Sequence, residues 1–253
     1  MKIVVLAQES ASTWMMVNAL RETYPDLKVF LEQPVSRWTL LRRRAARLGV
    51  WAVFGQVLFM LLVPFMCRSG RKRNAELIAA ARLSIHPPSD ITVVTGESVN
   101  SENCIAWLAQ ERPDVVVVNG TRIISAKVLE ACSALFLNTH CGITPAYRGV
   151  HGGYWALYQG EPQNMGVTVH LVNSGIDTGD IVYQEIAQVD NADNFLTYPV
   201  KQYIAGIPLM GKALGDIASS RLQTFHRNDL SSKLWHHPTI WQYLSAYLTR
   251  RVR

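Results

Sequence analysis

Three polar side chains near the middle of the chain have the residue types that acyl-group chemistry requires. Asn138 and His140 lie two positions apart at the end of an apolar run, and Asp177 lies in a glycine-flanked turn. When an amine attacks a carbonyl carbon, the tetrahedral intermediate carries a negative oxygen, which an amide N–H or a protonated imidazole stabilises. A histidine that titrates near neutrality can move the protons, and a carboxylate can fix its tautomer. We therefore take these three as candidate catalytic residues.

Each of these residues also has a common structural role. A single histidine at a strand end is more often a packed polar residue, and an aspartate between glycines is more often a turn residue. In an extended strand, residues two positions apart face the same side, so Asn138 and His140 can point into one cleft. The catalytic interpretation depends on whether Asp177 returns to that cleft.

The first half of the chain predicts an open, mostly parallel sheet. Short β-rich apolar runs at 2–7, 27–31, 91–95, 114–119 and 135–138 alternate with helical patterns. This alternation indicates an α/β, Rossmann-like fold with helices flanking both faces of the sheet. Ligands in such folds bind beyond the carboxyl ends of the strands, which is where the fifth run ends.

The second half departs from this pattern. Runs at 167–172 and 181–186, joined by a glycine-rich turn, predict a short antiparallel extension. Residues 195–222 have a helical tendency that Pro199 and Pro208 should interrupt. An aromatic and basic tail follows, which we expect to be helical.

One strongly apolar segment admits several interpretations. Residues 50–66 are apolar apart from Gln56, and basic clusters flank both ends. This length is at the lower limit for a bilayer-spanning helix, but a spanning helix has its positive charge mainly on one side. We expect a buried or partner-covered helix. Contact of residues 42–73 with an anionic membrane surface is the alternative, and a span is the least favoured.

The composition bounds the class of protein. The 253 residues are 49% hydrophobic and 17% charged, which disfavours wholesale disorder. The net charge of +6 favours an anionic small molecule, a nucleic acid or an acidic membrane surface as partner. The four cysteines are scattered without metal-ligand spacing, so we expect free thiols, no metal site and a cytoplasmic protein.

A dense series of motifs follows the fifth strand. NTHCGITPAYRG contains Asn-x-His and a proline loop, and GVTVHLVNSGIDTGDIV contains a strand histidine and an Asp-x-Gly turn. The series resembles the core signature of the folate-dependent formyltransferases, which include glycinamide ribonucleotide, methionyl-tRNA and nucleotide-sugar formyltransferases. The resemblance implies that Asn138, His140 and Asp177 are catalytic and that 10-formyltetrahydrofolate is the formyl donor. For the strand histidine, His170, we favour a packing role.

The resemblance also implies binding residues and a division of the chain. The donor's pterin end would lie in a slot of backbone groups, although two of these residues also suit a core: Arg122, Ile123, Ile124, Asn173, Ser174, Gly175 and Ile176. Our candidate acceptor contacts are Arg148, His151 and Tyr154. Residues 1–190 would form the formyltransferase catalytic domain, with 191–253 a helical C-terminal extension packed on it.

We expect the acceptor to be a primary amine, foremost an amino sugar carried by a nucleotide. The loop at 7–12 has no glycine and contains Glu9, which disfavours the phosphate of glycinamide ribonucleotide. Residues 190–253 are too short and too helical for the β-barrel of the tRNA enzymes, so no nucleic-acid partner is expected. The alternatives are a glycinamide ribonucleotide formyltransferase, a hydrolase that releases formate and a non-catalytic binding relative. A homodimer is left open.

Overall fold

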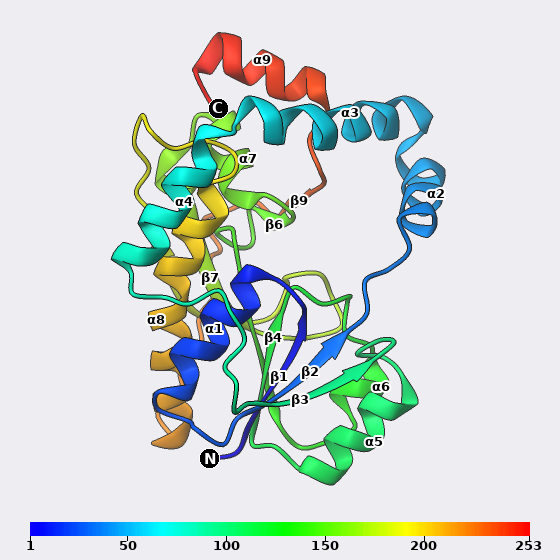
Figure 1. Cartoon of the computed structure of the whole chain (residues 1–253), viewed down its shortest axis with the longest axis vertical. Helices are drawn as coiled ribbons and strands as arrows, with labels where there is room; N and C mark the ends of the chain where they lie inside the picture. The colour runs from blue at the N-terminus through cyan, green and yellow to red at the C-terminus, as the bar shows by residue number, and fades with distance from the viewer.

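One seven-stranded sheet forms the middle layer of the molecule (Figure 1). The computed structural model describes residues 1–253, the side chain of Arg37 excepted. The strands are β1 (Ile3–Gln8), β2 (Lys28–Glu32), β3 (Thr92–Gly96), β4 (Val115–Asn119), β5 (Leu135–His140), β7 (Gly166–Leu171) and β8 (Ile181–Ile186). Their order is β3-β2-β1-β4-β5-β7-β8; the first five are parallel, and β7 runs antiparallel to both of its neighbours, β5 and β8. The Rossmann-like α/β fold is confirmed.

Helices cover both faces of this sheet. Helices α1 (Ala11–Arg21) and α8 (Tyr198–Ala218) pack on one face, and α5 (Glu102–Glu111) and α6 (Ala126–Leu129) pack on the other. The valine-rich strand β4 is buried along its whole length, as expected of a parallel strand covered on both sides. The sheet therefore gives a rigid base whose carboxyl edge positions the site.

Helix α8 runs as one helix of 21 residues, so the expected interruption by its prolines is wrong. Pro199 lies in the first turn, where a backbone N–H has no partner within the helix. Pro208 lies inside the helix without ending it. Burial of Ile207 and Met210 against the sheet keeps the helix continuous through this position.

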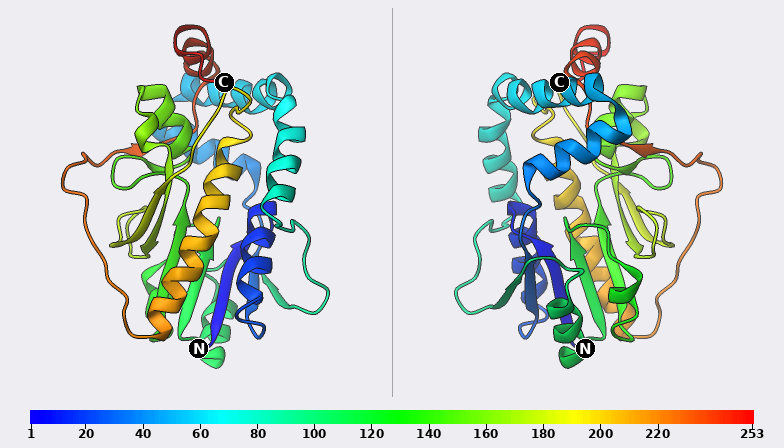
Figure 2. Two further views of the ribbon diagram at one scale, coloured as in Figure 1. Left: turned by 90° about the vertical axis from the view of Figure 1, so that its left-hand side faces the viewer. Right: turned by 90° about the vertical axis from the view of Figure 1, so that its right-hand side faces the viewer.

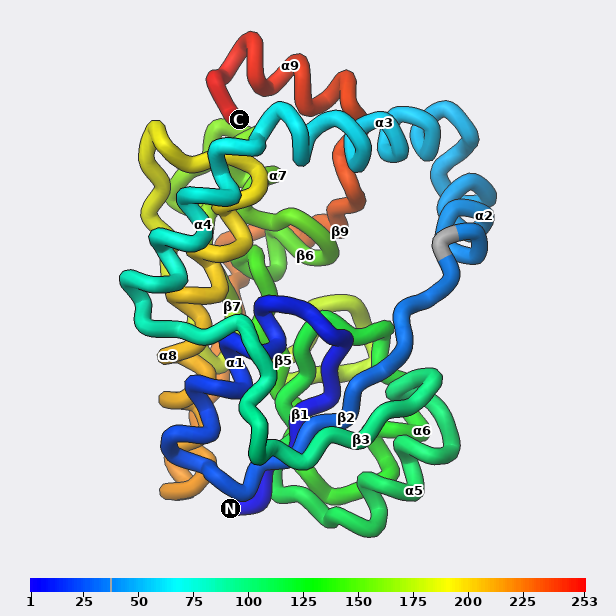
Figure 3. The backbone as a smooth tube through the Cα atoms, viewed as in Figure 1, coloured from blue at the N-terminus to red at the C-terminus, as the bar shows by residue number. Residues whose placement is uncertain are grey.

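The connection from β2 to β3 leaves the sheet, crosses the end of the molecule and returns (Figure 3). It consists of α2 (Arg37–Leu48), α3 (Val50–Met66) and α4 (Ser69–Ala80). Gly49 separates the first two helices with a φ of 85°, a left-handed value that glycine adopts without strain. This excursion places α2 opposite the carboxyl edge of the sheet.

Helix α3 is buried along one face and exposed along the other. The expectation of a buried helix is therefore met by one of its two faces. Phe59 and Val63 pack into a hydrophobic cluster, while Trp51 is 80% exposed and Leu61 is 68% exposed. No single helix among the described residues is long and apolar enough to cross a membrane. Helices α3 and α4 together meet that test by length and composition, but they are bent by 71°.

The chain after β5 builds a second core beside α3. It contains β6 (Arg148–Gly149), α7 (Gly152–Gln159), η1 (Pro162–Asn164), β9 (Leu234–Trp235) and α9 (Ile240–Arg250). Strands β6 and β9 pair in parallel, and α9 begins with a capping box between Thr239 and Gln242. Helices α9 and α3 lie side by side at one end of the molecule (Figures 1 and 2). The boundary at residue 190 stays a prediction.

Candidate active site

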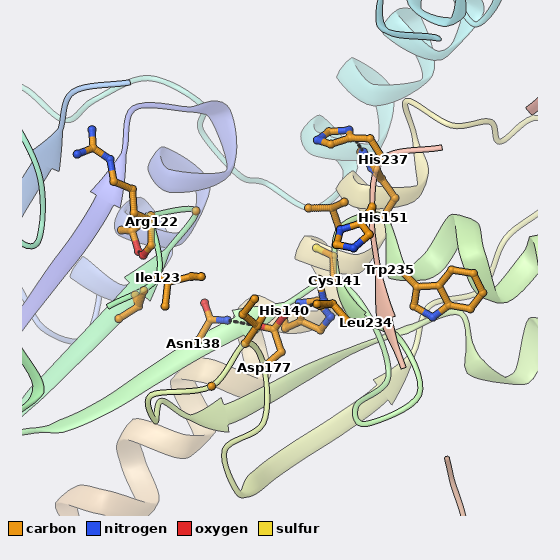
Figure 4. Close-up of a pocket in the computed structure, with 18 of the residues that line it drawn as sticks. Arg122, Ile123, Asn138, His140, Cys141, His151, Asp177, Leu234, Trp235 and His237 are labelled. Atoms are coloured by element: carbon orange, nitrogen blue, oxygen red, sulfur yellow. Dashed lines mark hydrogen bonds and ion pairs between the residues drawn. The ribbon is translucent and has the colours of Figure 1, made fainter. Parts of the chain in front are cut away.

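The three candidate catalytic residues lie together at the end of β5 (Figure 4). His140 Nδ1 is 3.4 Å from Oδ2 of Asp177, and Asn138 Nδ2 is 3.5 Å from its Oδ1. Asp177 lies in the turn between β7 and β8, where the N–H of Gly149 donates a 2.8 Å hydrogen bond to Oδ2. The structure thus brings an amide, an imidazole and a carboxylate into one site.

His170 also belongs to this cluster. The antiparallel register places it opposite Asn138. Its Nδ1 donates to the carbonyl of Leu171 at 2.7 Å, so in the neutral ring Nε2 accepts from Nδ2 of Asn138 at 3.1 Å. The side chain is 3% exposed. His170 is therefore packed, as the sequence suggested, and it also orients the amide, which the sequence did not suggest.

The carbonyl oxygen of Tyr147 fixes the tautomer of His140. It lies 2.7 Å from Nε2, and because a carbonyl only accepts, Nε2 carries the proton. In the neutral ring, the basic nitrogen is then Nδ1, which faces Asp177. A methyl group on Gly142 would collide with this carbonyl oxygen, so the close approach requires glycine. The expectation that Asp177 fixes the tautomer is wrong.

The carboxyl group of Asp177 is held in its charged form. Burial opposes ionisation, but the neighbouring rings of His140 and His170 and the N–H of Gly149 outweigh it and lower the pKa to about 2. Asp177 is therefore a fixed negative charge at neutral pH. Such a charge stabilises an imidazolium that forms at His140.

A cavity of about 830 Å³ opens between this cluster and helix α2. Its volume is in the range of small-molecule binding sites. Its lining includes Asn138, His140 and Asp177 together with residues from β4, α2, the 173–176 loop and the 234–237 segment. The cluster is thus open to a ligand.

The segment 122–124 forms one wall of the cavity. Ile123 is 58% exposed, whereas Ile124 is 4% exposed and packs in the core below. Within the described residues, the backbone N–H and C=O of Ile124 have no intramolecular partner, so they are available to a flat heterocycle. The side chain of Arg122 is occupied elsewhere, since Nη2 donates to the Gln33 carbonyl at 2.6 Å and Nε lies 3.4 Å from Glu32.

The loop 173–176 also borders the cavity, across from the segment 122–124. Asn173, Gly175 and Ile176 line the cavity, whereas Ser174 does not. Oδ1 of Asn173 accepts from the N–H of Gly175 at 3.0 Å and from the hydroxyl of Thr178 at 2.8 Å, which shapes the loop. Six of the seven candidate donor-binding residues therefore border the cavity.

Of the three candidate acceptor contacts, only His151 lines the cavity. Nη1 of Arg148 donates to the carbonyl of Ile176 at 3.2 Å, so this side chain braces the turn between β7 and β8. Tyr154 is 2% exposed and packs against Tyr243, because this face of α7 turns toward α9. The structure therefore excludes Tyr154 from the cavity.

Basic residues of α2 line the cavity from the side opposite the cluster, and no motif in the sequence indicated them. Arg43, Arg44 and Arg47 border the cavity. In the part of the chain that the structure describes, their side chains form no ion pair or hydrogen bond. Burial lowers the pKa of Arg44, and an anionic ligand would offset this cost. We call these three residues the arginine roof.

A histidine pair lies beside the arginine roof. Nε2 of His151 is 2.9 Å from Nδ1 of His237. Burial, then the His237 ring and Arg44, lower the pKa of His151 to about 3. Burial, then Arg44, lowers that of His237 to about 4. Both rings are neutral at pH 7, so one donates a hydrogen bond to the other.

Two other kinds of chemistry receive no support from the lining. Burial, and then the charge of Asp177, raise the pKa of Cys141 to about 12, so this thiol is a poor nucleophile at neutral pH. Among the described residues, no three His, Cys, Asp or Glu side chains come together in a group that could hold a metal ion. The amide, imidazole and carboxylate cluster is the chemistry that the cavity offers.

The sequence matches known formyltransferases. A family model described as Formyl transferase matches residues 67–201. A methionyl-tRNA formyltransferase from Finegoldia magna is 32% identical over 127 residues, which cover 50% of this chain and 41% of that protein. The chain spans about half the length of the curated relatives it matches.

Solved structures share the fold at low sequence identity. Glycinamide ribonucleotide transformylase 1 from Symbiobacterium toebii aligns with a TM-score of 0.58 and 18% identity, covering 92% of this chain and 94% of that one. The N-formyltransferase from Helicobacter canadensis, in complex with folinic acid and dTDP-3-aminofucose, aligns with a TM-score of 0.57 and 17% identity, covering 93% of this chain and 71% of that one.

The family match covers more than half of the chain and includes the whole candidate catalytic cluster. Asn138, His140, His170 and Asp177 all lie inside it, whereas the arginine roof on α2 lies outside it. The motifs, the fold and the family match agree, and the chain belongs to the formyl transferase family.

Proposed function

We propose that this chain transfers the formyl group of 10-formyltetrahydrofolate to the primary amine of an amino sugar carried by a nucleotide. The observation that carries the proposal is the convergence of Asn138, His140 and Asp177 on one cavity. The same cavity has a backbone-lined wall that suits a flat pterin and an arginine roof that suits an anionic acceptor.

The reaction begins when the amine nitrogen attacks the formyl carbon of the donor. A C–N bond forms, and the π electrons of the carbonyl move to its oxygen. Asn138 stabilises this oxyanion with an N–H, because its 3.5 Å contact with Asp177 is too long to be a strong hydrogen bond. The hydrogen bond with His170 keeps the amide in place during this step.

Proton transfer completes the exchange. Nδ1 of His140 accepts the proton that the attacking amine loses, and Asp177 stabilises the imidazolium. The intermediate then collapses. The carbonyl re-forms, the bond between the formyl carbon and N10 breaks, and N10 takes the electron pair of that bond and the proton held by the His140 imidazolium. No covalent enzyme intermediate is needed.

The arginine roof supports an acceptor with phosphate groups. Guanidinium groups bind phosphate oxygens with charge-assisted hydrogen bonds. The His151–His237 pair lies next to Arg44 and offers neutral hydrogen-bonding groups suited to a sugar or base. A nucleotide-linked amino sugar has both chemistries in one molecule.

The start of α1 supports glycinamide ribonucleotide less well. The hydroxyl of Ser10 accepts from the N–H of Thr13 at 3.2 Å, and the hydroxyl of Thr13 donates to the carbonyl of Gln8 at 2.6 Å. The chain itself thus uses these groups, and none of them lines the cavity. A phosphate would have to displace them.

The test is a donor-turnover assay with 10-formyltetrahydrofolate and a panel of amines. The panel contains dTDP- and UDP-linked amino sugars, glycinamide ribonucleotide and methionyl-tRNA. We expect turnover with a nucleotide-linked amino sugar and none without an amine. Turnover only with glycinamide ribonucleotide or methionyl-tRNA would refute the acceptor class. Formate release without any amine would identify a hydrolase instead.

A further inference from the structure

Helices α3 and α9 lie at one end of the molecule (Figure 2). Both helices carry large apolar side chains that are exposed. Trp51 is 80% exposed and Phe65 is 70% exposed on α3, and Leu248 is 78% exposed on α9. The α3/α9 face comprises Val50, Trp51, Phe54, Leu61, Leu62, Phe65, Trp241, Leu244 and Leu248. Leaving so many large apolar side chains in water is unfavourable for a surface without a partner.

The residues of the α3/α9 face form one continuous surface. On α3 they recur three and four positions apart, which places them along one side of the helix. Gly55 lets α9 approach closely, because a side chain there would collide with the Trp241 ring. The ring centroids of Phe54 and Trp241 are 6.3 Å apart, and those of Trp51 and Phe54 are 6.2 Å apart. The two exposed stripes therefore join through aromatic contacts.

The charge around the α3/α9 face has one sign. Residues 33–75 contain nine Lys and Arg and no Asp or Glu, and residues 230–253 contain four and none. The rest of the chain holds 12 Lys and Arg against all 19 Asp and Glu. The positive charge of the protein is thus concentrated in the segments that carry the apolar face, while the remainder is acidic.

Acidic residues just outside these segments or elsewhere in the chain lie near basic residues of this region. Arg73 pairs with Asp190 at 2.9 Å, and Lys72 lies 4.0 Å from Glu76. Arg68 lies over the exposed ring of Phe65, 5.6 Å from its centroid. The arginine roof, which also belongs to the basic segments, lines the cavity, whereas Arg68, Arg71 and Lys72 are exposed beside the C-terminal end of α3, where they can reach an anionic surface.

We propose that the α3/α9 face docks on an anionic phospholipid bilayer. An apolar stripe with tryptophans, bordered by arginines, is the pattern of a helix that lies in the plane of the membrane interface. The apolar side chains would enter the boundary between headgroups and acyl chains, and the arginines would contact lipid phosphates. Trp51 and Trp241 would lie at the headgroup level.

A second copy of the chain is the competing occupant. A two-fold interface through this face would bring two acid-free basic segments toward each other. Like charges in such proximity are destabilising, and the face has no carboxylates to pair with them. An anionic bilayer satisfies both the apolar stripe and the charge, so it fits the face better than a second copy.

The test is cosedimentation of the full chain with phosphatidylcholine vesicles, with and without phosphatidylglycerol, at low and raised salt. The variant Leu61→Glu with Phe65→Glu adds two negative charges to the α3/α9 face. The matched control, Ile85→Glu with Ile186→Glu, adds the same charge at two other partly exposed apolar positions, each 38% exposed. Circular dichroism checks folding, and Trp51→Ser with Leu248→Ser replaces the first variant if it is unfolded.

We expect binding to the anionic vesicles only, weakened by salt. The first variant should reduce the bound fraction at least about tenfold, and the control should match the wild type. Equal loss in both variants would overturn the proposal, as would absence of wild-type binding at low salt. A wild-type dimer that Leu61→Glu with Phe65→Glu makes monomeric, without vesicle binding, would assign the face to a second copy.

Discussion

The catalytic cluster and the arginine roof lie on opposite sides of one cavity but arise differently. Strand register builds the cluster, since Asn138 pairs with His170 and the loop between β7 and β8 returns Asp177 to them. Tertiary packing builds the roof, because α2 packs against α3, whose Gln56 donates to the His237 carbonyl. The cluster lies inside the family match and the roof outside it. We infer that the cluster supplies the chemistry and the roof the choice of acceptor.

The largest expected effect comes from His140→Ala. Removal of the base should lower kcat by about 10²- to 10⁴-fold, because the attacking amine then has no group to take its proton. Steady-state kinetics measure the loss, and donor binding followed by fluorescence should be unchanged. The matched control is His226→Ala, an exposed histidine outside the cavity. If His140→Ala keeps most of the activity, the cluster does not supply the chemistry, and the proposed division of roles between the cluster and the arginine roof is wrong.

Asp177→Asn tests whether the charge of the Asp177 carboxylate also stabilises the folded protein. The folded-state pKa of about 2 is below the ordinary value of 3.8, so the carboxylate contributes stability above about pH 4 and loses it as the pH falls through 2. The contribution is about 2 kcal/mol. Urea unfolding of the wild type should therefore show an extra loss of that size between pH 5 and pH 2.

The variant Asp177→Asn should lack this extra loss, and Asp180→Asn, in the same turn, should retain it. Because Asp177 is ionised at all pH values above about 4, any fall in activity between pH 7 and pH 5 must come from another group. A difference in unfolding free energy between the wild type and Asp177→Asn that stays constant from pH 5 to pH 2 would show that the carboxylate is not held as the structure indicates.

Arg44→Ala tests the arginine roof from the other side. If the guanidinium binds an acceptor phosphate, KM for the acceptor should rise about tenfold while kcat and the donor KM stay near wild type. Arg42→Ala is the matched control, because Arg42 lies on the same helix outside the cavity lining. If Arg42→Ala raises the acceptor KM as much as Arg44→Ala does, the arginines act through their overall positive charge and Arg44 makes no specific contact with the acceptor.

The contrast between the two regions explains what the sequence could predict. Residues two apart on a strand share a side, and a strand end is the ligand edge of a parallel sheet, so Asn138 and His140 could be assigned from local pattern. The arginines of α2 could not, because nothing local says where a helix that ends at a glycine hinge will lie. Their clustering was attributed to the flank of an apolar segment, and their place at the cavity depends on contacts about 180 residues away in the sequence.

The same limit explains the residues that were misassigned. Tyr154 follows the motif region closely in sequence, yet the face of α7 on which it lies packs against α9. Pro208 resembles a helix breaker, but buried neighbours keep α8 continuous. Both outcomes are decided by tertiary packing, which overrides local propensity.

The smallest expected effect separates two adjacent isoleucines of the donor wall. Ile123 is 58% exposed in the cavity, so Ile123→Ala should raise the donor KM a few-fold, about 1 kcal/mol or less, with little change in stability. Ile124 is buried, so Ile124→Val should lower the free energy of unfolding by about 1 kcal/mol and leave the donor KM unchanged, since its contribution to the wall is backbone. Kinetics and urea unfolding of the two variants measure both quantities. The reverse pattern, with Ile124→Val affecting the donor KM and Ile123→Ala only stability, would mean that the folate does not lie against this wall.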